Sequence, residues 1–146
     1  MVAMDPDQLN DFLVAAFPDS PLPMVVTRAD DDGVEVVRPF DPSSLRPGGT
    51  LSGPALMALA DCTAYAAVVS RIGPEPLTVT SHLAIDFLRK PPPAGLRAEG
   101  ELLKIGRRQA IVAIRIHSDV DDELVAYCTC TYALPSVPTV PRADLS

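Results

Sequence analysis

One acidic residue stands inside the most apolar stretch of the chain and is the first candidate for chemistry. Asp61 lies between Ala60 and Cys62, in a run from Ala55 to Val69 where nearly every other residue is apolar or small. An unpaired buried charge is costly, so Asp61 must be hydrogen-bonded, face a cavity or have a raised pKa. Two interpretations stay open: a structural carboxylate held by a backbone amide or a threonine, and a general base or nucleophile in a pocket.

The same stretch predicts the long helix that positions this carboxylate. Ser52 suits an N-cap, and Gly53 and Pro54 suit the first turn, where a missing proline N–H costs nothing. Gly73-Pro74 ends the helix after about five turns. Because apolar residues cover nearly every face, we expect other structure to surround the helix on most sides.

The predicted N-terminus of this helix is a second chemical feature. Helix N-termini carry unpaired N–H groups and a positive dipole end, which stabilise a developing oxyanion. Pro54 has no N–H, and Ser52 as a cap would accept from Ala55, so the Gly53 N–H stays available. Glycine also lets a ligand approach closely, although a tight entry turn alone would explain Gly53.

The remaining pattern predicts one α+β domain over residues 1–146. A short N-terminal helix (1–18) precedes a hairpin around the acidic turn Asp30-Asp31-Asp32-Gly33, and a loop at 39–47 leads to the central helix. Four strands follow, at 77–88, 96–105, 109–117 and 124–133, and residues 135–146 are expected to be a flexible tail. A single apolar helix beside such a meander is buried only if the antiparallel sheet curls around it.

Charge and cysteine usage limit the class of protein. The net charge of −7 argues against nucleic acid as a partner. Three cysteines, in apolar or strand-like segments, argue against a disulfide framework, and Cys128 and Cys130 lack further ligands at metal-site spacing. The N-terminus has no signal-peptide pattern, and no window approaches the roughly 18 apolar residues of a membrane span. We expect a cytoplasmic protein without a metal or a membrane segment.

Basic residues are concentrated in one part of this acidic chain. Seven of the twelve lysines and arginines lie between Arg89 and Arg115, among only two acidic residues. Arg and Lys side chains that converge bind phosphate oxygens well, so this region could bind a small phosphorylated ligand. Solvated strand ends and turns would give the same pattern.

Several of these features together resemble a known family. The long loop, the small-residue helix with an internal Leu-Ala-Asp, the strand ending in Phe-Leu-Arg-Lys-Pro and the strand pair joined by a Gly-Arg turn resemble the hotdog-fold acyl-CoA thioesterases, in particular the PaaI-like branch of phenylacetic acid degradation. The resemblance covers Pro39 to Leu134. It implies a hotdog fold, in which a curved antiparallel sheet wraps around one long central helix. It also implies an acyl-CoA substrate and no cofactor, since coenzyme A is present only as part of the substrate.

The resemblance also assigns residues. Asp61 matches the family's general base or nucleophile, Gly53 the residue whose N–H polarises the thioester carbonyl, and Thr80 a serine or threonine that helps to hold the water. The family has a His-Gly-Gly motif nine positions before the acid, and Ser52 stands in place of its histidine. Arg46 stands in place of a family asparagine.

These assignments predict an acyl-CoA thioesterase acting on an aryl- or short- to medium-chain acyl group. The acyl group would lie against Met57 and Tyr65, and His82 is the histidine expected near the pocket. The nucleotide phosphates would lie against basic residues after two of the strands, Arg89, Lys90, Arg107 and Arg108. Because the motif histidine is missing, the alternative is a non-catalytic acyl-CoA or acyl-carrier binding protein of the same fold.

Helix geometry adds an expectation about assembly. Gly53 and Asp61 are eight residues apart, about 12 Å along a helix axis. One reacting carbonyl needs its hydrogen-bond donor and its base each within roughly 3.5 Å. We therefore expect Gly53 of one protomer to face Asp61 of another, in a two-fold homodimer or a tetramer formed by two such dimers. The resembling family also builds its sites between paired subunits.

Overall fold

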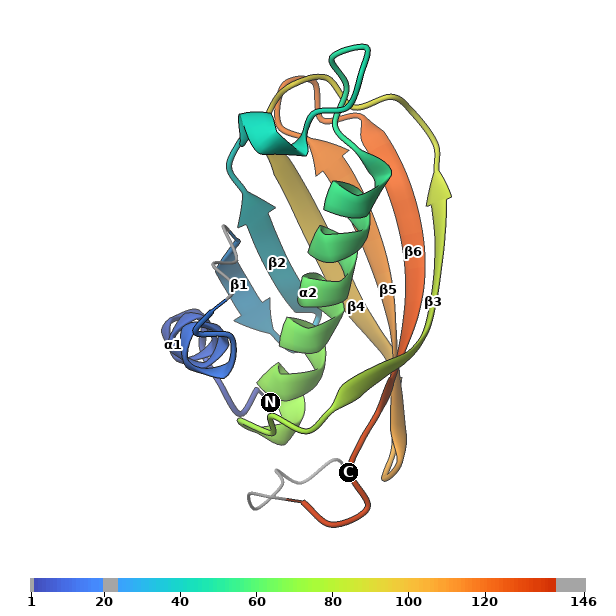
Figure 1. Ribbon diagram of the computed structural model, residues 1–146. Helices are drawn as coiled ribbons and strands as arrows, with labels where there is room; N and C mark the ends of the chain where they lie inside the picture. The colour runs from blue at the N-terminus through green and yellow to red at the C-terminus, as the bar shows by residue number, and fades with distance from the viewer. Residues whose placement is uncertain (1, 20–23, 139–146) are drawn as a thin grey trace.

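A long helix lying across a curved six-stranded antiparallel sheet organises the computed structural model (Figure 1), which describes residues 2–19 and 24–138. The strand order is β1-β2-β4-β5-β6-β3. The elements are α1 (Pro6–Ala16), β1 (Val25–Asp30), β2 (Gly33–Arg38), η1 (Pro42–Ser44), α2 (Gly53–Ile72), β3 (Val79–Phe87), β4 (Leu96–Ile105), β5 (Gln109–Ser118) and β6 (Leu124–Ala133). This arrangement confirms the predicted α+β hotdog fold.

The two ends of α2 follow the predicted capping residues. The Ser52 side chain accepts a hydrogen bond from the Ala55 amide at 3.3 Å, while the Ser52 backbone is extended. At the other end Gly73 has φ of 100°, a conformation that side chains with a Cβ rarely adopt, and its amide donates to the Val69 carbonyl. The helix therefore begins after Ser52 and ends before Gly73, the two residues that the sequence predicted for its ends.

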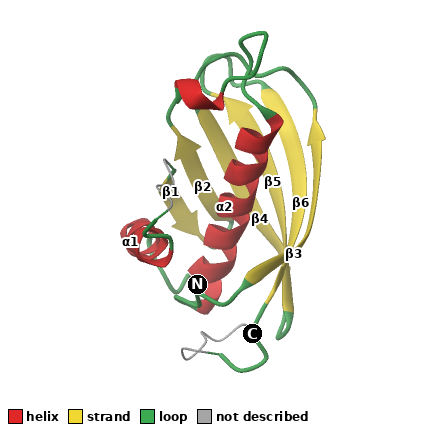
Figure 2. Ribbon diagram, in the orientation of Figure 1, coloured by secondary structure: helices red, strands yellow, loops and turns green. Residues whose placement is uncertain are grey.

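Most of α2 is buried against the concave face of the sheet (Figure 2). The helix approaches β4 closely at Gly100, where an added Cβ would lie 2.9 Å from Thr63 Cγ2. Contrary to the expectation that no window approaches a membrane span, α2 is long and apolar enough to cross a membrane by length and composition alone, but 78% of its apolar window is buried inside this fold. Its side chains are thus used to fill the core of the hotdog sheet.

One stripe of α2 is not covered, contrary to the expectation that structure would surround nearly all of it. Pro54, Met57 and Ala58 are exposed, and Asp61 is half-buried. These positions follow one another at the spacing of a single helix face. The helix is therefore open to solvent along one side of its N-terminal half, on the side that also carries Asp61.

The loops and turns differ from the sequence-based expectation in detail. Strands β1 and β2 extend into the predicted acidic turn, because Asp30 pairs with Gly33 and leaves only Asp31-Asp32 as the turn. The predicted loop at 39–47 contains the short 3-10 helix η1, which Asp41 caps through the Ser43 amide. In the predicted tail, residues 135–138 form no helix or strand, and 139–146 lie outside the described residues.

Helix α1 packs beside the first edge of the sheet (Figure 1). The Asn10 side chain imitates a neighbouring strand: its amide donates to the Val26 carbonyl at 3.0 Å, and its oxygen accepts from the Val26 amide at 2.8 Å. Asp5 and Gln8 form a capping box at the start of the helix. The pairing holds α1 against β1 and satisfies backbone groups on an edge strand.

The opposite edge of the sheet is formed by β3. Among the strands described, β3 pairs only with β6, so one side of its backbone is unpaired. Apolar side chains on and beside β3 are more than half exposed: Leu77, Val79, Phe87 and Leu88. An exposed apolar edge strand is a natural position for pairing with another strand.

Replacing Asn10 by Ala should loosen the attachment of α1 to the sheet. Both hydrogen bonds to Val26 are lost and leave partly buried backbone groups, so we expect the free energy of unfolding to fall by about 1–2 kcal/mol. Urea denaturation measures this. Asp11→Ala, at an exposed position of the same helix, is the matched control and should change the free energy by less than about 0.5 kcal/mol. Equal stabilities of the two variants would contradict the role of Asn10.

Candidate active site

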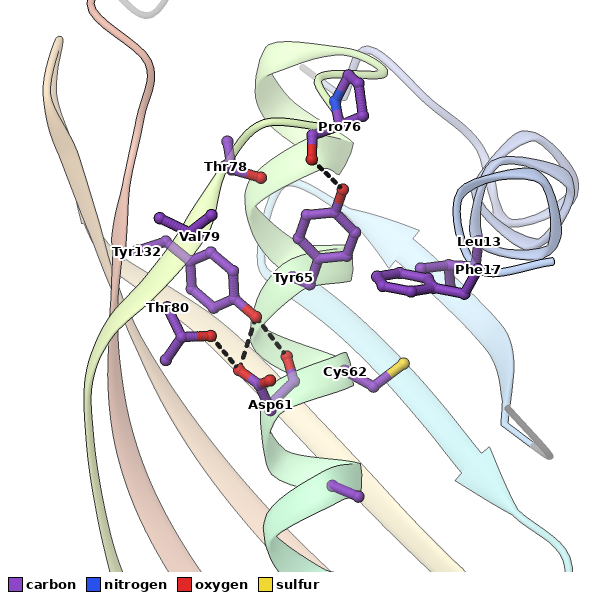
Figure 3. A pocket seen from close by; sticks show the side chains of 11 residues that line it. Leu13, Phe17, Asp61, Cys62, Tyr65, Pro76, Thr78, Val79, Thr80 and Tyr132 are labelled. Atoms are coloured by element: carbon purple, nitrogen blue, oxygen red, sulfur yellow. Dashed lines mark hydrogen bonds between the residues drawn. The ribbon is translucent and has the colours of Figure 1, made fainter. Parts of the chain in front are cut away.

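Asp61 projects from the third turn of α2 toward strands β3 and β6 (Figure 3). Its Oδ1 atom accepts a hydrogen bond from Thr80 Oγ1 at 2.6 Å and another from the Tyr132 hydroxyl at 2.7 Å. Cys130 Sγ lies 4.0 Å from the same oxygen. No described residue donates a hydrogen bond to Oδ2. The carboxylate is therefore held on one oxygen and open on the other.

A cavity of about 440 Å³ lies beside this carboxylate. Its walls come from α1, from one face of α2, from the segment before β3, and from β3 and β6 (Figure 3). The lining residues are Leu13, Phe17, Ala58, Asp61, Cys62, Tyr65, Pro76, Thr78, Val79, Thr80 and Tyr132. Asp61 is the only Asp or Glu among the described residues that line it. A single carboxylate thus faces a mainly apolar and aromatic cavity.

Aromatic rings form part of the cavity wall. The Tyr65 ring stacks on the Tyr132 ring at a centroid distance of 5.8 Å and an interplanar angle of 24°. Phe17, which also lines the cavity, meets Tyr65 edge-on at 5.8 Å. Phe12 is outside the lining, and its ring lies 5.9 Å from that of Tyr65. The aromatic wall therefore depends in part on α1, which carries Phe12 and ends at the C-cap residue Phe17.

Gly53, the second residue predicted to take part in the chemistry, is the first residue of α2. Ser52 satisfies the Ala55 amide, and the Gly53 amide donates to no residue in the part of the chain that the structure describes. A Cβ on Gly53 would lie 3.4 Å from the Phe87 ring, at the far end of β3 from Thr80. The Gly53 amide and the Asp61 carboxylate are thus two separate features of one helix.

The structure brings together only some of the other predicted residues. Tyr65 and Thr80 line the cavity, whereas Met57 and His82 do not. Met57 lies on the open stripe of α2 and is 41% exposed, and the exposed His82 follows a bulge in β3. Arg46 is exposed in the loop before α2, where its backbone forms a turn with Thr50.

The predicted phosphate-binding residues form two separate groups. The Arg89 amide donates to the Val125 carbonyl at one end of β6, whereas the Arg108 carbonyl accepts from the Leu134 amide at the other. Nine residues of strand separate these points, about 30 Å. Within one chain Arg89 and Lys90 therefore cannot share a phosphate group with Arg107 and Arg108. Arg89 also pairs with Glu123 at 3.2 Å.

The sequence analysis missed Tyr132. This residue is 3% exposed and ends the inward-facing series Cys128, Cys130 and Tyr132 on β6. A buried tyrosine normally needs a hydrogen-bond partner for its hydroxyl. The position of Tyr132 on the inward face of its strand could therefore have indicated a polar partner in the core. Burial raises the pKa of Tyr132 well above its usual range, and the Asp61 charge raises it further, so the hydroxyl stays protonated.

Comparison with known proteins agrees with this geometry. The family model of the thioesterase superfamily matches residues 48–125. The chain belongs to the thioesterase superfamily. A putative thioesterase from Silicibacter sp. TM1040 is 34% identical, with a TM-score of 0.84 over 92% of this chain and 94% of that one. The comparison with curated proteins gives no match.

Two more distant structures share the fold of this thioesterase superfamily member. Zebrafish thioesterase superfamily member 2 is 19% identical, with a TM-score of 0.79 over 91% of this chain and 100% of that one. A hypothetical thioesterase from Streptococcus pneumoniae TIGR4, solved with coenzyme A, is 22% identical, with a TM-score of 0.71 over 94% and 98% of the two chains. Family membership and the Silicibacter neighbour support a thioesterase-type function.

The three cysteines of this thioesterase superfamily member should react slowly with thiol reagents. Burial raises the pKa of Cys62 and Cys130 to about 12 and that of Cys128 to about 11, and the Asp61 charge adds to each shift. At pH 8 the reactive thiolate of Cys62 is then about one part in ten thousand. We expect iodoacetamide to alkylate the native protein at least about a hundredfold more slowly than the urea-unfolded protein. Similar rates, measured by mass spectrometry, would contradict the buried state of the thiols.

Proposed function

We propose that the protein is an acyl-CoA thioesterase of the PaaI-like branch that hydrolyses an aryl- or short- to medium-chain acyl-CoA. The observation that carries this proposal is the half-buried Asp61 carboxylate, hydrogen-bonded on Oδ1 and facing an apolar cavity of about 440 Å³. A carboxylate in this setting can act as a general base or as a nucleophile. The proposed chemistry uses side chains, backbone amides and water, so coenzyme A enters only as part of the substrate, and the proposed location is the cytoplasm.

The acyl group would occupy the cavity. Its wall offers aromatic and aliphatic surface from Phe17, Tyr65 and Val79, and its volume falls within the range of small-ligand pockets. Such a cavity suits an aryl ring or a short aliphatic chain. Met57, on the open stripe of α2, would lie at the mouth rather than inside.

In the general-base form of the reaction, Asp61 takes a proton from a water molecule as the water oxygen bonds to the thioester carbonyl carbon. The electron pair of the C=O bond moves to oxygen, where the Gly53 N–H at the positive end of α2 stabilises it. The C=O bond then re-forms, the C–S bond breaks, and the coenzyme A thiolate takes up a proton. In the nucleophile form, an Asp61 oxygen bonds to the carbonyl carbon, the C–S bond breaks, and the coenzyme A thiolate leaves and takes up a proton. Water then hydrolyses the resulting anhydride, which releases the acid and restores the Asp61 carboxylate.

The two groups would act together across a dimer. Along β3, Phe87 lies next to Gly53 of its own chain, and Thr80 lies next to Asp61. Two β3 edges that pair antiparallel, with Thr80 beside Phe87 of the partner, would bring Asp61 level with the partner's Gly53. The unpaired backbone and exposed apolar side chains of β3 favour this contact. The homodimer, alone or as half of a tetramer, would contain two equivalent sites.

The same pairing would bring the basic groups together. Arg107 and Arg108 lie near the Thr80 end of the sheet, and Arg89 and Lys90 follow its Phe87 end. In an antiparallel pair, one group from each protomer would flank each site. Arginines arranged in this way could bind the coenzyme A phosphates, although neither group lines the cavity itself.

Two departures from the family pattern favour a second candidate function. Ser52 replaces the family histidine, and the exposed Arg46 replaces the family asparagine. If these losses remove hydrolysis, the protein would be a non-catalytic acyl-CoA or acyl-carrier binding protein with the same cavity. Incubation with a panel of acyl-CoAs and a thiol reagent separates the candidates, because only a hydrolase releases free coenzyme A.

Replacing Asp61 by Asn should remove turnover on that panel and preserve binding. Loss of the base should lower kcat by about a thousandfold, since general-base catalysis contributes about 10²–10⁴. Titration calorimetry should give an acyl-CoA Kd within about threefold of the wild type, because the shape of the side chain is kept. Asp121→Asn, at an exposed acid outside the cavity, is the control. Unchanged turnover in Asp61→Asn would reject Asp61 as the catalytic carboxylate.

Mixing two inactive variants tests whether each site is shared between subunits. Gly53→Pro removes the amide hydrogen, and proline is well tolerated at the first position of a helix. Each variant alone should be inactive, but a heterodimer of Gly53→Pro with Asp61→Asn would contain one intact site. After subunit exchange of an equal mixture, we expect about one quarter of wild-type activity. Native mass spectrometry measures how much heterodimer forms. If heterodimers form and stay inactive, the site lies within one chain.

A further inference from the structure

Tyr132 makes two contacts with the same residue of the central helix. Its hydroxyl lies 2.7 Å from Asp61 Oδ1 and 3.0 Å from the Asp61 backbone carbonyl oxygen (Figure 3). Both neighbours are acceptors, so the hydroxyl acts as a donor to Asp61. Its contact with the backbone as well as the side chain fixes the hydroxyl relative to the helix. Tyr132 is thus placed to restrain the orientation of the Asp61 carboxylate.

The surroundings of Tyr132 keep this donor in place. Its ring is 3% exposed and stacks on Tyr65, which leaves the side chain little freedom to turn away. The raised pKa of Tyr132 keeps the hydroxyl protonated throughout the pH range in which a carboxylate ionises. Thr80, on the neighbouring strand β3, supplies the second donor at 2.6 Å.

Both donors act on Oδ1, which makes the two carboxylate oxygens unequal. Hydrogen bonds to Oδ1 fix the plane of the carboxylate and leave Oδ2 without a donor among the described residues. We propose that Tyr132 is a positioning residue that, together with Thr80, holds Oδ1 of Asp61 so that Oδ2 is the oxygen presented to the thioester carbonyl or to the attacking water. This role rests on the proposed function of Asp61.

The other groups near Asp61 do not compete with these two donors. Cys128 and Cys130 face it from β6, and Cys62 adjoins it on α2; burial raises the pKa of all three thiols. No described Lys, Arg or His side chain forms an ion pair with Asp61. Among the described residues, the orientation of the carboxylate therefore depends mainly on Tyr132 and Thr80.

Tyr132→Phe tests the proposal because it removes the hydroxyl and keeps the ring stack. Loss of this donor leaves Oδ1 held mainly by Thr80, so the carboxylate presents Oδ2 to the reacting carbon less often. We expect kcat to fall about tenfold with KM within about threefold, because the positioning of the carboxylate changes and the cavity wall does not.

Tyr127→Phe is the matched control. It removes a hydroxyl from the same strand, but Tyr127 does not line the cavity, and its ring centroid lies 5.3 Å from the guanidinium carbon of Arg115. This variant should keep the wild-type kcat and KM. An unchanged kcat in Tyr132→Phe would overturn the proposal. Equal losses of kcat in both variants would also overturn it, because they would show a general effect of removing a hydroxyl from β6.

A crystal structure of Tyr132→Phe tests the positioning role without relying on turnover. The Asp61 carboxylate should turn away from its wild-type orientation in Tyr132→Phe and in Thr80→Val, and it should keep that orientation in Tyr127→Phe. An unchanged carboxylate in Tyr132→Phe contradicts the positioning role even if Asp61→Asn abolishes hydrolysis. Conversely, a turned carboxylate together with full turnover in Asp61→Asn would reject the proposed function and with it the catalytic part of this proposal. If Tyr132→Phe does not fold, Thr80→Val carries the same comparison for the other donor to Oδ1.

Discussion

The hydrogen bonds that Thr80 and Tyr132 donate to Asp61 join the central helix to the two strands at one edge of the sheet. A carboxylate on an otherwise apolar helix needs such partners, because an uncompensated buried charge destabilises a fold strongly. Both donors use one oxygen, so the charge is stabilised without being fully enclosed. The same contacts that stabilise the Asp61 charge therefore leave Oδ2 without a donor among the described residues, as the proposed reaction requires. The cavity beside it, walled by α1 and by stacked aromatic rings, offers apolar surroundings that suit the proposed acyl group.

The length of one helix imposes a second constraint. The Gly53 amide at the start of α2 and the Asp61 carboxylate are about 12 Å apart along the axis, too far to act on one carbonyl. The open stripe of α2 and the unpaired edge of β3 lie on the side where these groups are found. A two-fold partner would cover this surface and complete both sites. Assembly, oxyanion stabilisation and phosphate binding in the proposed enzyme thus depend on the same edge strand.

Local signals in the sequence predicted much of the fold. Ser52 and Gly73 defined the ends of the central helix, and alternation and turn residues placed β4 and β6 at their observed bounds. Asp61 and Thr80 came from the helix pattern and the family resemblance. Tyr132 was missed because its partner Asp61 lies 71 positions away in the sequence, and only the packing of α2 against β6 brings the two together. The basic residues were close in sequence, yet the length of the strands between them separates them into two groups, which charge counting could not reveal.

The most direct test is a crystal structure of the protein with a non-hydrolysable acyl-CoA analogue in which a methylene group replaces the thioester sulfur. The account predicts a two-fold dimer with the acyl group in the cavity and the carbonyl carbon within about 3.5 Å of Asp61 Oδ2 or of a water bound to it. The carbonyl oxygen should accept a hydrogen bond from the Gly53 amide of the other protomer. An acyl group bound outside the cavity, or a carbonyl remote from Asp61, would contradict the account.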